Sequence, residues 1–354
     1  MRFIVSKMGH AFFAILTLAC ANTSYAQLNK AFNQVFREML DRRLKLSPGV
    51  HGNHFLQAAD LAGGLLAPTL NGLIASNVAA FPISSATIAT LTFNVDAGRP
   101  VSSTESLGPI LAETAETLGK NQINVGINYT YLNLAKFRGL STQDIRFTFT
   151  HQDVTNDGTL GESPNESDLI DIFPDMDVNA SVLAVVMAWG VNSNLDLGVA
   201  VPIINVHLRG NAKAVASSFT FQTSGAANHH FGADAANPVL ETVVPYDERA
   251  TGLGDVAIRL KYNWLRSREI DFATLFEMRL PTGNEADFLG AGKSNFKFYS
   301  ILSKRFGNFT PHLNLGWDKR NANFDSDEFG LLPASIKKSC QVSTWRSSLP
   351  AIMI

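Results

Sequence analysis

Hydrophobic and polar residues alternate most regularly between residues 251 and 283. In the first of two runs, one face is apolar and the other is polar or charged: Val256, Ile258, Leu260, Tyr262 and Trp264 oppose Asp255, Arg259, Lys261 and Asn263. The second run repeats this pattern, with Ile270, Phe272, Phe276 and Met278 opposing Asp271, Glu277 and Arg279. A period of two predicts β-strands. Strands of this length fit either a wall between lipid and water or one side of a long soluble hairpin.

The same period continues along the chain and predicts nine strands. They span residues 85–96, 123–137, 145–153, 172–191, 195–209, 254–265, 270–281, 295–306 and 309–320. From residue 138 onward the links alternate in length: 138–143, 192–194, 266–269 and 307–308 are short, whereas 154–168, 211–251 and 283–294 are long. Outer-membrane barrels have short periplasmic turns and long outer loops. A soluble sandwich has no reason to keep this order, so the link lengths favour a barrel.

Residues 27–84 show a helical period instead. Leu28, Phe32, Phe36 and Leu40 recur at helical spacing, and Ser47-Pro48-Gly49 then ends the first helix. A second helical stretch runs from about residue 55 to residue 78, where a proline at position 68 is expected to kink or split it. The sequence leaves open whether this segment lies in the periplasm or plugs a barrel lumen.

The first 26 residues have the pattern of a secretory signal peptide. Arg2 and Lys7 form its basic region, residues 11–21 its apolar region, and Ser24-Tyr25-Ala26 its cleavage site. Removing two basic and no acidic residues changes 29 Lys+Arg and 31 Asp+Glu to 27 and 31, a net charge of −4. A mildly acidic exported protein is a poor candidate for nucleic-acid binding. Cys340 would then be the single cysteine, which excludes an internal disulfide.

Residues 321–354 show no alternation and are expected to be irregular. Nine strands is an odd number, whereas bacterial single-chain barrels use even numbers, and an open edge in lipid would leave backbone groups unpaired. We therefore expect a truncated or frameshifted C-terminus that lacks closing strands. The predicted fold is all-β: an antiparallel outer-membrane β-barrel over residues 85–320, with about 9–10 visible strands and about 12 if intact. A helical N-terminal segment precedes it.

In such a barrel the charged face would line the lumen and the apolar face would meet lipid. The lumen-facing candidates are Arg146, Asp196, Asp255, Arg259, Lys261, Asp271, Glu277, Arg279, Lys297 and Arg305. These charges would either pair across strands to order the wall or form a constriction that filters solutes. An aromatic girdle at the short-turn end would contain Trp189, Tyr262, Trp264, Phe306 and Phe309, because amphipathic rings favour the membrane interface. The hairpin register is expected to pair Arg259 with Glu277, or Asp255 with Arg279.

The histidines do not form a recognisable metal-binding motif. His51 and His54 have no carboxylate or cysteine near them in the sequence, and the adjacent His229 and His230 would point apart in an extended chain. Capping or packing roles are the simpler interpretation. We therefore expect no bound metal and no cofactor, although the alternative of a metal site at either pair stays open.

Two further stretches resemble motifs only in part. Residues 153–158 begin like a calcium loop, but Pro164 stands where an EF-hand requires glutamate, which leaves at most weak calcium binding. Gly292-Lys293-Ser294 ends like a phosphate-binding loop, but Asp287 replaces its first glycine and a strand follows. No nucleophile elbow or clear catalytic triad is found. The sequence predicts no catalytic residue and a protein that is not an enzyme.

Five stretches of the chain resemble one known family. They are SLGPILAETAETLGKNQINVGINYTYL (106–132), WGVNSNLDLGVAVPI (189–203), ATGLGDVAIRLKYNW (250–264), LPTGNEADFLGAG (280–292) and SKRFGNFTPHLNLGW (303–317). The Gly-Leu-Gly-Asp and Leu-Pro-Thr-Gly elements, in this order and spacing, are the most specific. Together they are similar to the MetA-pathway of phenol degradation family of outer-membrane, transporter-like proteins. The tail after about residue 323 departs from the family's closing strands.

The resemblance implies a barrel related to channels for hydrophobic compounds. We therefore expect a porin-like outer-membrane channel for passive uptake of small molecules, with aromatic or hydrophobic compounds as solutes by family analogy. Its partners would be outer-membrane lipid and the solute. The alternatives are a structural or adhesive barrel without transport and, third, a barrel enzyme. The sequence gives neither the pore width nor the oligomeric state.

Overall fold

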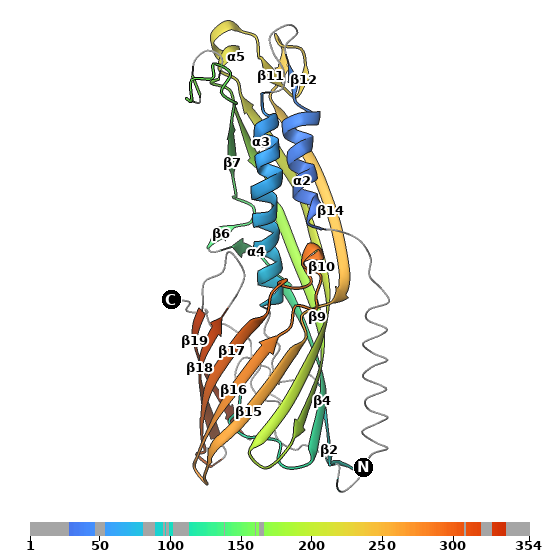
Figure 1. Cartoon of the computed structure of the whole chain (residues 1–354), viewed down its shortest axis with the longest axis vertical. Coiled ribbons are helices and arrows are strands. Elements are labelled where there is room, and N and C mark those ends of the chain that lie inside the picture. The colour runs from blue at the N-terminus through green and yellow to red at the C-terminus, as the bar shows by residue number, and fades with distance from the viewer. Residues whose placement is uncertain are drawn as a thin grey trace.

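The computed structural model describes residues 28–46, 54–80, 89–94, 96, 99–101, 113–137, 139–159, 161–162, 166–307, 309–319 and 328–337. The predicted signal peptide, His51 and Cys340 lie outside these residues. The described elements form a wide antiparallel sheet, which we call the sheet body, and a narrower column above it, which we call the extension (Figure 1). The two parts share strands β9 (Met176–Gly190) and β10 (Leu195–Ser217).

The sheet body is an ordered series of antiparallel strands. Their order is β19–β18–β17–β16–β15–β10–β9–β4–β2–β3. The remaining bounds are β2 Ala89–Asn94, β3 Arg99–Val101, β4 Gln122–Asn133, β15 Ala257–Arg266, β16 Ile270–Arg279, β17 Asn295–Lys304, β18 Phe309–Lys319 and β19 Glu328–Lys337. The predicted antiparallel β-structure is confirmed. Its closure into a barrel is not, because among the described residues β3 and β19 end the sheet and no strand pair joins them.

β10 is much longer than predicted and continues upward into the extension. It pairs with β15 along Leu195–Ala200 and then with β14 (Glu241–Leu253) along Ile203–Val215. The prediction of a loop over residues 211–251 is therefore wrong. That range holds the end of β10, the helix α5 (Phe219–Ser224), the short strands β11 (His229–His230), β12 (Gly232–Ala233) and β13 (Pro238–Val239), and most of β14. Its strands are rich in alanine and charged residues, so they lack the apolar signal that a half-buried strand usually gives.

Further strands widen the extension at its upper end. β7 (Phe147–Thr150) pairs with β8 (Leu169–Phe173), and β8 pairs with the last residues of β10. The predicted strand 172–191 is thus divided, because Asp175 takes a positive φ of 47° between β8 and β9. A small hairpin of β5 (Lys136–Phe137) and β6 (Leu140–Ser141) lies beside them.

The predicted N-terminal helices are present and pack against one face of the extension. They are α2 (Lys30–Arg37), the π-helical turn η1 (Glu38–Arg42), and a continuous helical run of α3 (Leu56–Leu61), the π-helical turn η2 (Ala62–Leu66) and α4 (Ala67–Ala79). The run is continuous from Leu56 to Ala79, so Pro68, in the first turn of α4, does not split it. The wider turn immediately before it, where the Ala67 N–H donates to the Ala62 carbonyl, accommodates the missing Pro68 donor.

These helices and the extension share one hydrophobic core. Phe32 and Phe36 of α2 and Ile74 of α4 are fully buried, together with Val206 and Leu208 of β10. At the upper tip, β1 (Lys45–Leu46) pairs with β11, which fixes the N-terminal segment to the long hairpin. The run Leu56–Ala79 is long and apolar enough to cross a membrane, yet its buried side packs into this core, so we assign it to the extension.

The polarity of the two sheet faces reverses between the sheet body and the extension. We call the face that carries Arg259 and Glu277 the inner face. On the outer face of β10, Leu197 and Ile203 in the sheet body give way to Asn205 and Arg209 in the extension. The inner face shows the opposite change, from charged residues below to alanine, valine and leucine above. The extension therefore has a normal apolar core, whereas the sheet body is apolar outside and charged inside.

Part of the tail also differs from the prediction. Residues 328–337, which were expected to be irregular, form β19 and pair with β18 along its length. Gly330 and Pro333 interrupt the alternation that would have indicated a strand. Pairing with a neighbouring strand supplies the backbone hydrogen bonds that the local sequence does not predict.

Candidate functional site

Charged residues gather on the inner face of the sheet body and form ion pairs there. Arg259 lies directly opposite Glu277 in the β15–β16 ladder, which confirms the first of the two predicted registers. The Arg259 Nε donates to Glu277 Oε2 at 2.7 Å, and the Arg279 Nε donates to Glu277 Oε1 at 2.8 Å. Glu277 and Arg279 are each 2% exposed. One buried carboxylate thus joins two guanidinium groups from neighbouring strand positions.

The segment Glu113–Leu118 lies along this inner face. Glu113 Oε1 is 3.3 Å from Arg259 Nη1 and its Oε2 is 3.5 Å from Lys261 Nζ. The Ala115 N–H donates to Ser303 Oγ at 3.0 Å, and the Ala115 carbonyl accepts from the Asn263 amide at 2.8 Å. The segment is therefore bound to strands β15 and β17 through both its side chains and its backbone.

The lower end of the same segment is bound in the same way. The Leu118 N–H donates to both carboxylate oxygens of Asp196, at 3.0 and 3.2 Å. Arg305 pairs with Glu116 at 2.8 Å and also with Asp271. Glu113 and Glu116 lie in no alternating run or recognisable motif of the sequence. The only sequence signal was their position inside the first family-like stretch.

Nine of the ten predicted inward residues lie on the inner face or at its edges, and Arg146 does not. Lys297 pairs with Asp318 at 3.1 Å, and Arg279 also donates to the carbonyl of Ala79 at the end of α4. Arg146 instead precedes β7 in the extension, where it pairs with Asp171 at 2.7 Å and remains half exposed. The prediction for Arg146 is wrong because the strand that follows it belongs to the extension.

The outer face of the sheet body exposes large apolar side chains. They are Leu183, Trp189, Leu197, Ile258, Leu260, Tyr262, Trp264, Phe276, Phe298, Leu302, Phe306, Leu313, Leu315 and Trp317. On β4 the outward apolar run extends from Ile123 to Tyr131, which is about the 9–11 residues that a tilted membrane strand needs. An apolar patch of this extent indicates contact with an apolar medium or a partner surface.

The predicted girdle residues lie at the short-turn end of this outer face. Trp264 is 64% exposed, its indole N–H donates to Thr274 Oγ1 at 3.0 Å, and its ring lies 4.6 Å from that of Tyr262. Trp189 and Phe306 are also exposed at this end, whereas the side chain of Phe309 lies outside the described residues. At the opposite end, Tyr131 and Trp317 are further exposed aromatic residues that the sequence analysis did not select.

The two most specific family-like elements form a single hydrogen-bonded cluster above β15 and β16. Asp255, at the end of Gly-Leu-Gly-Asp, accepts from the N–H groups of Gly283 at 3.0 Å and Ala291 at 2.8 Å. Thr282 donates to the Gly254 carbonyl at 2.8 Å and accepts from the Val256 N–H at 2.9 Å. Asp255 therefore holds the loop after β16 in place and is 3% exposed.

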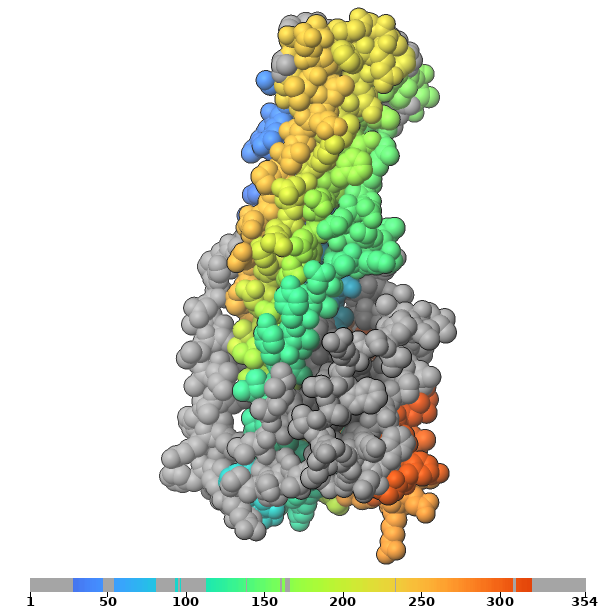
Figure 2. All heavy atoms as spheres, turned by 180° about the vertical axis from the view of Figure 1, so that it is seen from behind, coloured from blue at the N-terminus to red at the C-terminus, as the bar shows by residue number. Residues whose placement is uncertain are grey.

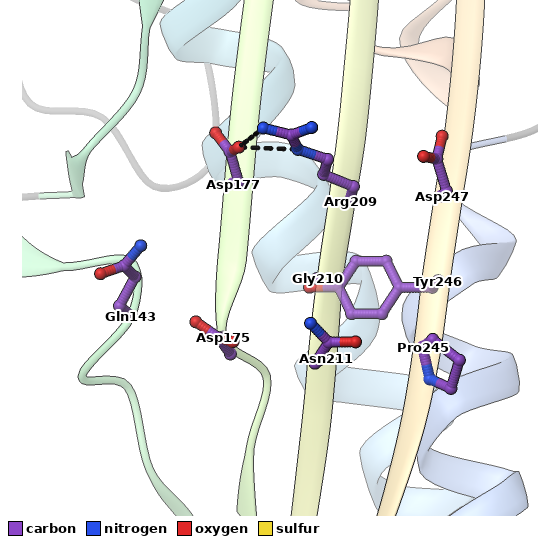
Figure 3. A pocket seen from close by; sticks show the side chains of 9 residues that line it. All are labelled: Gln143, Asp175, Asp177, Arg209, Gly210, Asn211, Pro245, Tyr246 and Asp247. Atoms are coloured by element: carbon purple, nitrogen blue, oxygen red, sulfur yellow. Dashed lines mark hydrogen bonds and ion pairs between the residues drawn. The ribbon is translucent and has the colours of Figure 1, made fainter.

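A polar hollow lies on the outer face of the extension (Figure 3). It has a volume of about 570 Å³ and lies over β9, β10 and β14. Arg209 donates to Asp177 through two nitrogens, at 2.7 and 2.8 Å, and the Tyr246 ring lies across Gly210. Burial raises the pKa of Tyr246, whose hydroxyl donates to the Pro174 carbonyl at 2.9 Å. Because Asp177 neutralises its arginine, this hollow is a weaker candidate site than the inner face.

The stretch that resembles a calcium loop uses its first carboxylate for backbone contacts. Asp153 accepts from the N–H groups of Asn156 at 2.5 Å and Gly158 at 2.9 Å. The Gly158 N–H, in particular, holds the pKa of Asp153 below its usual value. The carboxylate oxygens thus already serve as acceptors within the loop, which does not favour a calcium site.

One histidine from each of the two sequence pairs, His54 and His229, lies in a buried cluster. His54, at the start of the α3 run, and His229 of β11 lie together with His151, which follows β7. One ring nitrogen of each lies within 4.8 Å of the other two, and all three residues are buried. His230 instead bonds to the Gly232 carbonyl through Nδ1 at 2.9 Å. His151 was not predicted as a partner of these histidines, because it lies about a hundred residues from His54 in the chain.

The described sheet has a charged buried face and an apolar exposed face, a polarity that is typical of β-proteins in contact with an apolar medium. The chain belongs to the MetA-pathway of phenol degradation family, whose sequence model matches residues 148–334. This range contains four of the five stretches that resembled the family, and the predicted membership is confirmed. The family is associated with outer-membrane proteins, and its name points to a phenol degradation pathway. No curated protein and no solved structure matches the chain significantly.

Proposed function

We propose that this protein is a porin-like channel of the bacterial outer membrane for passive uptake of small molecules. The observation that carries this proposal is the reversed polarity of the sheet body. A soluble sheet buries its apolar face, whereas here Glu277 and Arg279 are buried and Leu260 and Phe276 are exposed. Exposing apolar side chains to water and burying charged ones both cost free energy. Lipid around the outer face and water along the inner face would remove both costs.

The link lengths support one orientation of the channel in the membrane. The turns between β9 and β10, between β15 and β16 and between β17 and β18 are short and lie at the lower end of the sheet body in Figure 1. The extension rises from the opposite end, where the long links are. By the rule for outer-membrane barrels, the short turns face the periplasm and the extension projects from the cell.

The Glu113–Leu118 segment would set the width and charge of the passage. It is held to the inner face by Asp196, Arg259, Lys261 and Arg305, so a solute that follows this face meets it. α4 ends above the same face, where Arg279 bonds to Ala79, and would narrow the upper entrance. By the family name, the proposed solutes are small aromatic or hydrophobic compounds.

Ion selectivity in planar bilayers tests this proposal. Glu113→Gln removes the negative charge that faces Arg259 and Lys261, so we expect the reversal potential in a salt gradient to move toward anion selectivity. Glu241→Gln is the matched control, because Glu241 pairs with Lys213 at 2.9 Å on the exposed extension. A wild-type protein that inserts and conducts, but whose selectivity Glu113→Gln leaves unchanged, would contradict the role of this segment.

The second candidate is a structural or adhesive envelope protein without transport. The observation that favours it is the occupation of the inner face by Glu113–Leu118, together with a polar extension suited to surface contacts. Liposome swelling separates the two candidates. Entry of small sugars and of an aromatic acid such as benzoate supports the channel, whereas liposomes that contain inserted protein but do not swell support the structural role.

A further inference from the structure

We propose that His54, His151 and His229 bind one divalent transition-metal ion of the zinc class in the upper part of the extension. The three histidines come from separate parts of the chain: the start of the α3 run, the residue after β7, and β11 of the long hairpin. They are 8%, 0% and 1% exposed. Burial of three imidazoles at one point is unusual for a packing role alone and suits a metal site, for which imidazole is the commonest ligand.

The histidine ring nitrogens lie close enough together to bind one ion. One ring nitrogen of each lies within 4.8 Å of the other two, and His54 Nδ1 is 2.7 Å from His151 Nε2. Zinc–nitrogen bonds of about 2.0–2.1 Å at tetrahedral angles place ligand nitrogens roughly 3.4 Å apart. The His54–His151 distance is shorter than this spacing, so these two rings would move apart when the ion binds.

Two of the three imidazoles are oriented by a hydrogen bond to an oxygen atom. In each, the bond involves the ring nitrogen that points away from the cluster. His229 Nδ1 is 2.7 Å from Asp168 Oδ2, and His151 Nδ1 is 2.8 Å from the Gln152 carbonyl oxygen. A carboxylate or carbonyl that accepts from the second nitrogen fixes the tautomer and makes the first nitrogen a better ligand. Both imidazoles would therefore bind the ion through Nε2.

Asp168 is itself held in position by the start of α5. Its Oδ1 accepts from the Phe219 N–H at 2.7 Å, and its Oδ2 lies 3.4 Å from Ser218 Oγ. Asp168 is 4% exposed, so this carboxylate would lie buried beside the proposed ion. Asp168 and His229 thus supply the two protein groups of a carboxylate–histidine–metal arrangement.

The surroundings favour a buried ion over an exposed, rapidly exchanging one. The Phe55 ring lies 5.2 Å from that of His229 and 5.5 Å from that of His151, and it is fully buried. An apolar ring beside the ligands limits solvent access. The ion would connect the N-terminal helices to β7 and to the long hairpin, and its fourth position would take water or a small solute.

Metal binding to the untagged full-length protein in detergent tests the proposal. After dialysis against a chelator and then against buffer, titration with zinc chloride should show one ion bound per chain, checked by elemental analysis. Copper and nickel should compete, since imidazole suits all three ions, and magnesium should not. His151→Gln and His229→Gln should abolish this binding, whereas His230→Gln, a buried neighbour outside the cluster, should retain it.

Two further measurements keep the test decisive if a histidine variant fails to fold. Asp168→Asn keeps all three ligands and should weaken zinc binding about 10–100-fold. Zinc should raise the thermal midpoint of the wild-type protein, because binding to the folded state stabilises it. The proposal is overturned if the wild type binds no stoichiometric zinc, or if His151→Gln folds and binds zinc as tightly as the wild type.

Discussion

Gly283, in the Leu-Pro-Thr-Gly element, occupies a place where no side chain fits. A Cβ atom there would lie 2.4 Å from the Leu289 carbonyl oxygen and 2.8 Å from the Gly290 Cα. The Gly283 N–H also donates to Asp255, so the backbone cannot move away without losing this bond. The family element is thus explained by a close approach of two backbone segments.

We expect Gly283→Ala to destabilise the protein by about 1–3 kcal/mol, the usual cost of an overpacked site. Urea unfolding in detergent, followed by circular dichroism, measures the free energy of unfolding. Gly64→Ala is the matched control: a Cβ there meets nothing within 4 Å, and alanine favours the helical backbone by up to about 1 kcal/mol. Equal effects of the two substitutions would contradict the close approach at Gly283.

At the scale of single elements, β15 presents its apolar side outward. Leu260 is 41% exposed and lies between Ile258 and Tyr262 on that side, while Arg259 and Lys261 face the segment Glu113–Leu118. In water such a strand would expose hydrocarbon and bury charge. In lipid the same strand places each face in its preferred surroundings.

This difference gives a test of the medium around β15. If lipid surrounds it, Leu260→Arg should destabilise the folded protein by about 2–4 kcal/mol in lipid bilayers. Val239→Arg serves as the control, since Val239 is 47% exposed on the extension and should change stability by less than about 0.5 kcal/mol. Refolding equilibria in vesicles provide the measurement. An effect of Leu260→Arg as small as that of the control would indicate water at this face.

At the scale of the whole molecule, the structure divides into an apolar-walled sheet body and a polar extension. Figure 2 shows the extension as a column in which β9, β10 and β14 lie side by side, as they do in Figure 1. The outer surface of this column carries Arg209, Asp247 and Arg249, which suit water. The proposed orientation places this column outside the cell.

Cysteine labelling of intact cells tests this orientation. In a Cys340→Ser background, Asn237→Cys near the tip of the extension should react with a membrane-impermeable maleimide. Ser193→Cys, in the short turn between β9 and β10, should react only after the outer membrane is permeabilised. Both residues are exposed, so their own accessibility does not bias the result. Labelling of Ser193→Cys in intact cells would reverse the proposed orientation.

The sequence by itself determined most strands of the sheet body, although not β19, and the polarity of their two faces. The period of two is local: Ile258 and Arg259 point to opposite sides of any extended strand, whatever surrounds it. Matching charges on one face limited the hairpin to two registers, and the structure has the one that pairs Arg259 with Glu277. Family membership was equally readable, because the glycine and aspartate elements keep their spacing along the chain.

Only the tertiary structure decided the extension, the inner segment and the histidine cluster. The upper part of β10 and β14 carry alanines and charges, and they are strands because they pair with each other and pack under α2 and α4. His54, His151 and His229 meet because three distant segments converge at the upper end of the extension, which no local pattern records. Local periodicity reports the direction of a side chain, whereas long-range pairing determines which residues it meets.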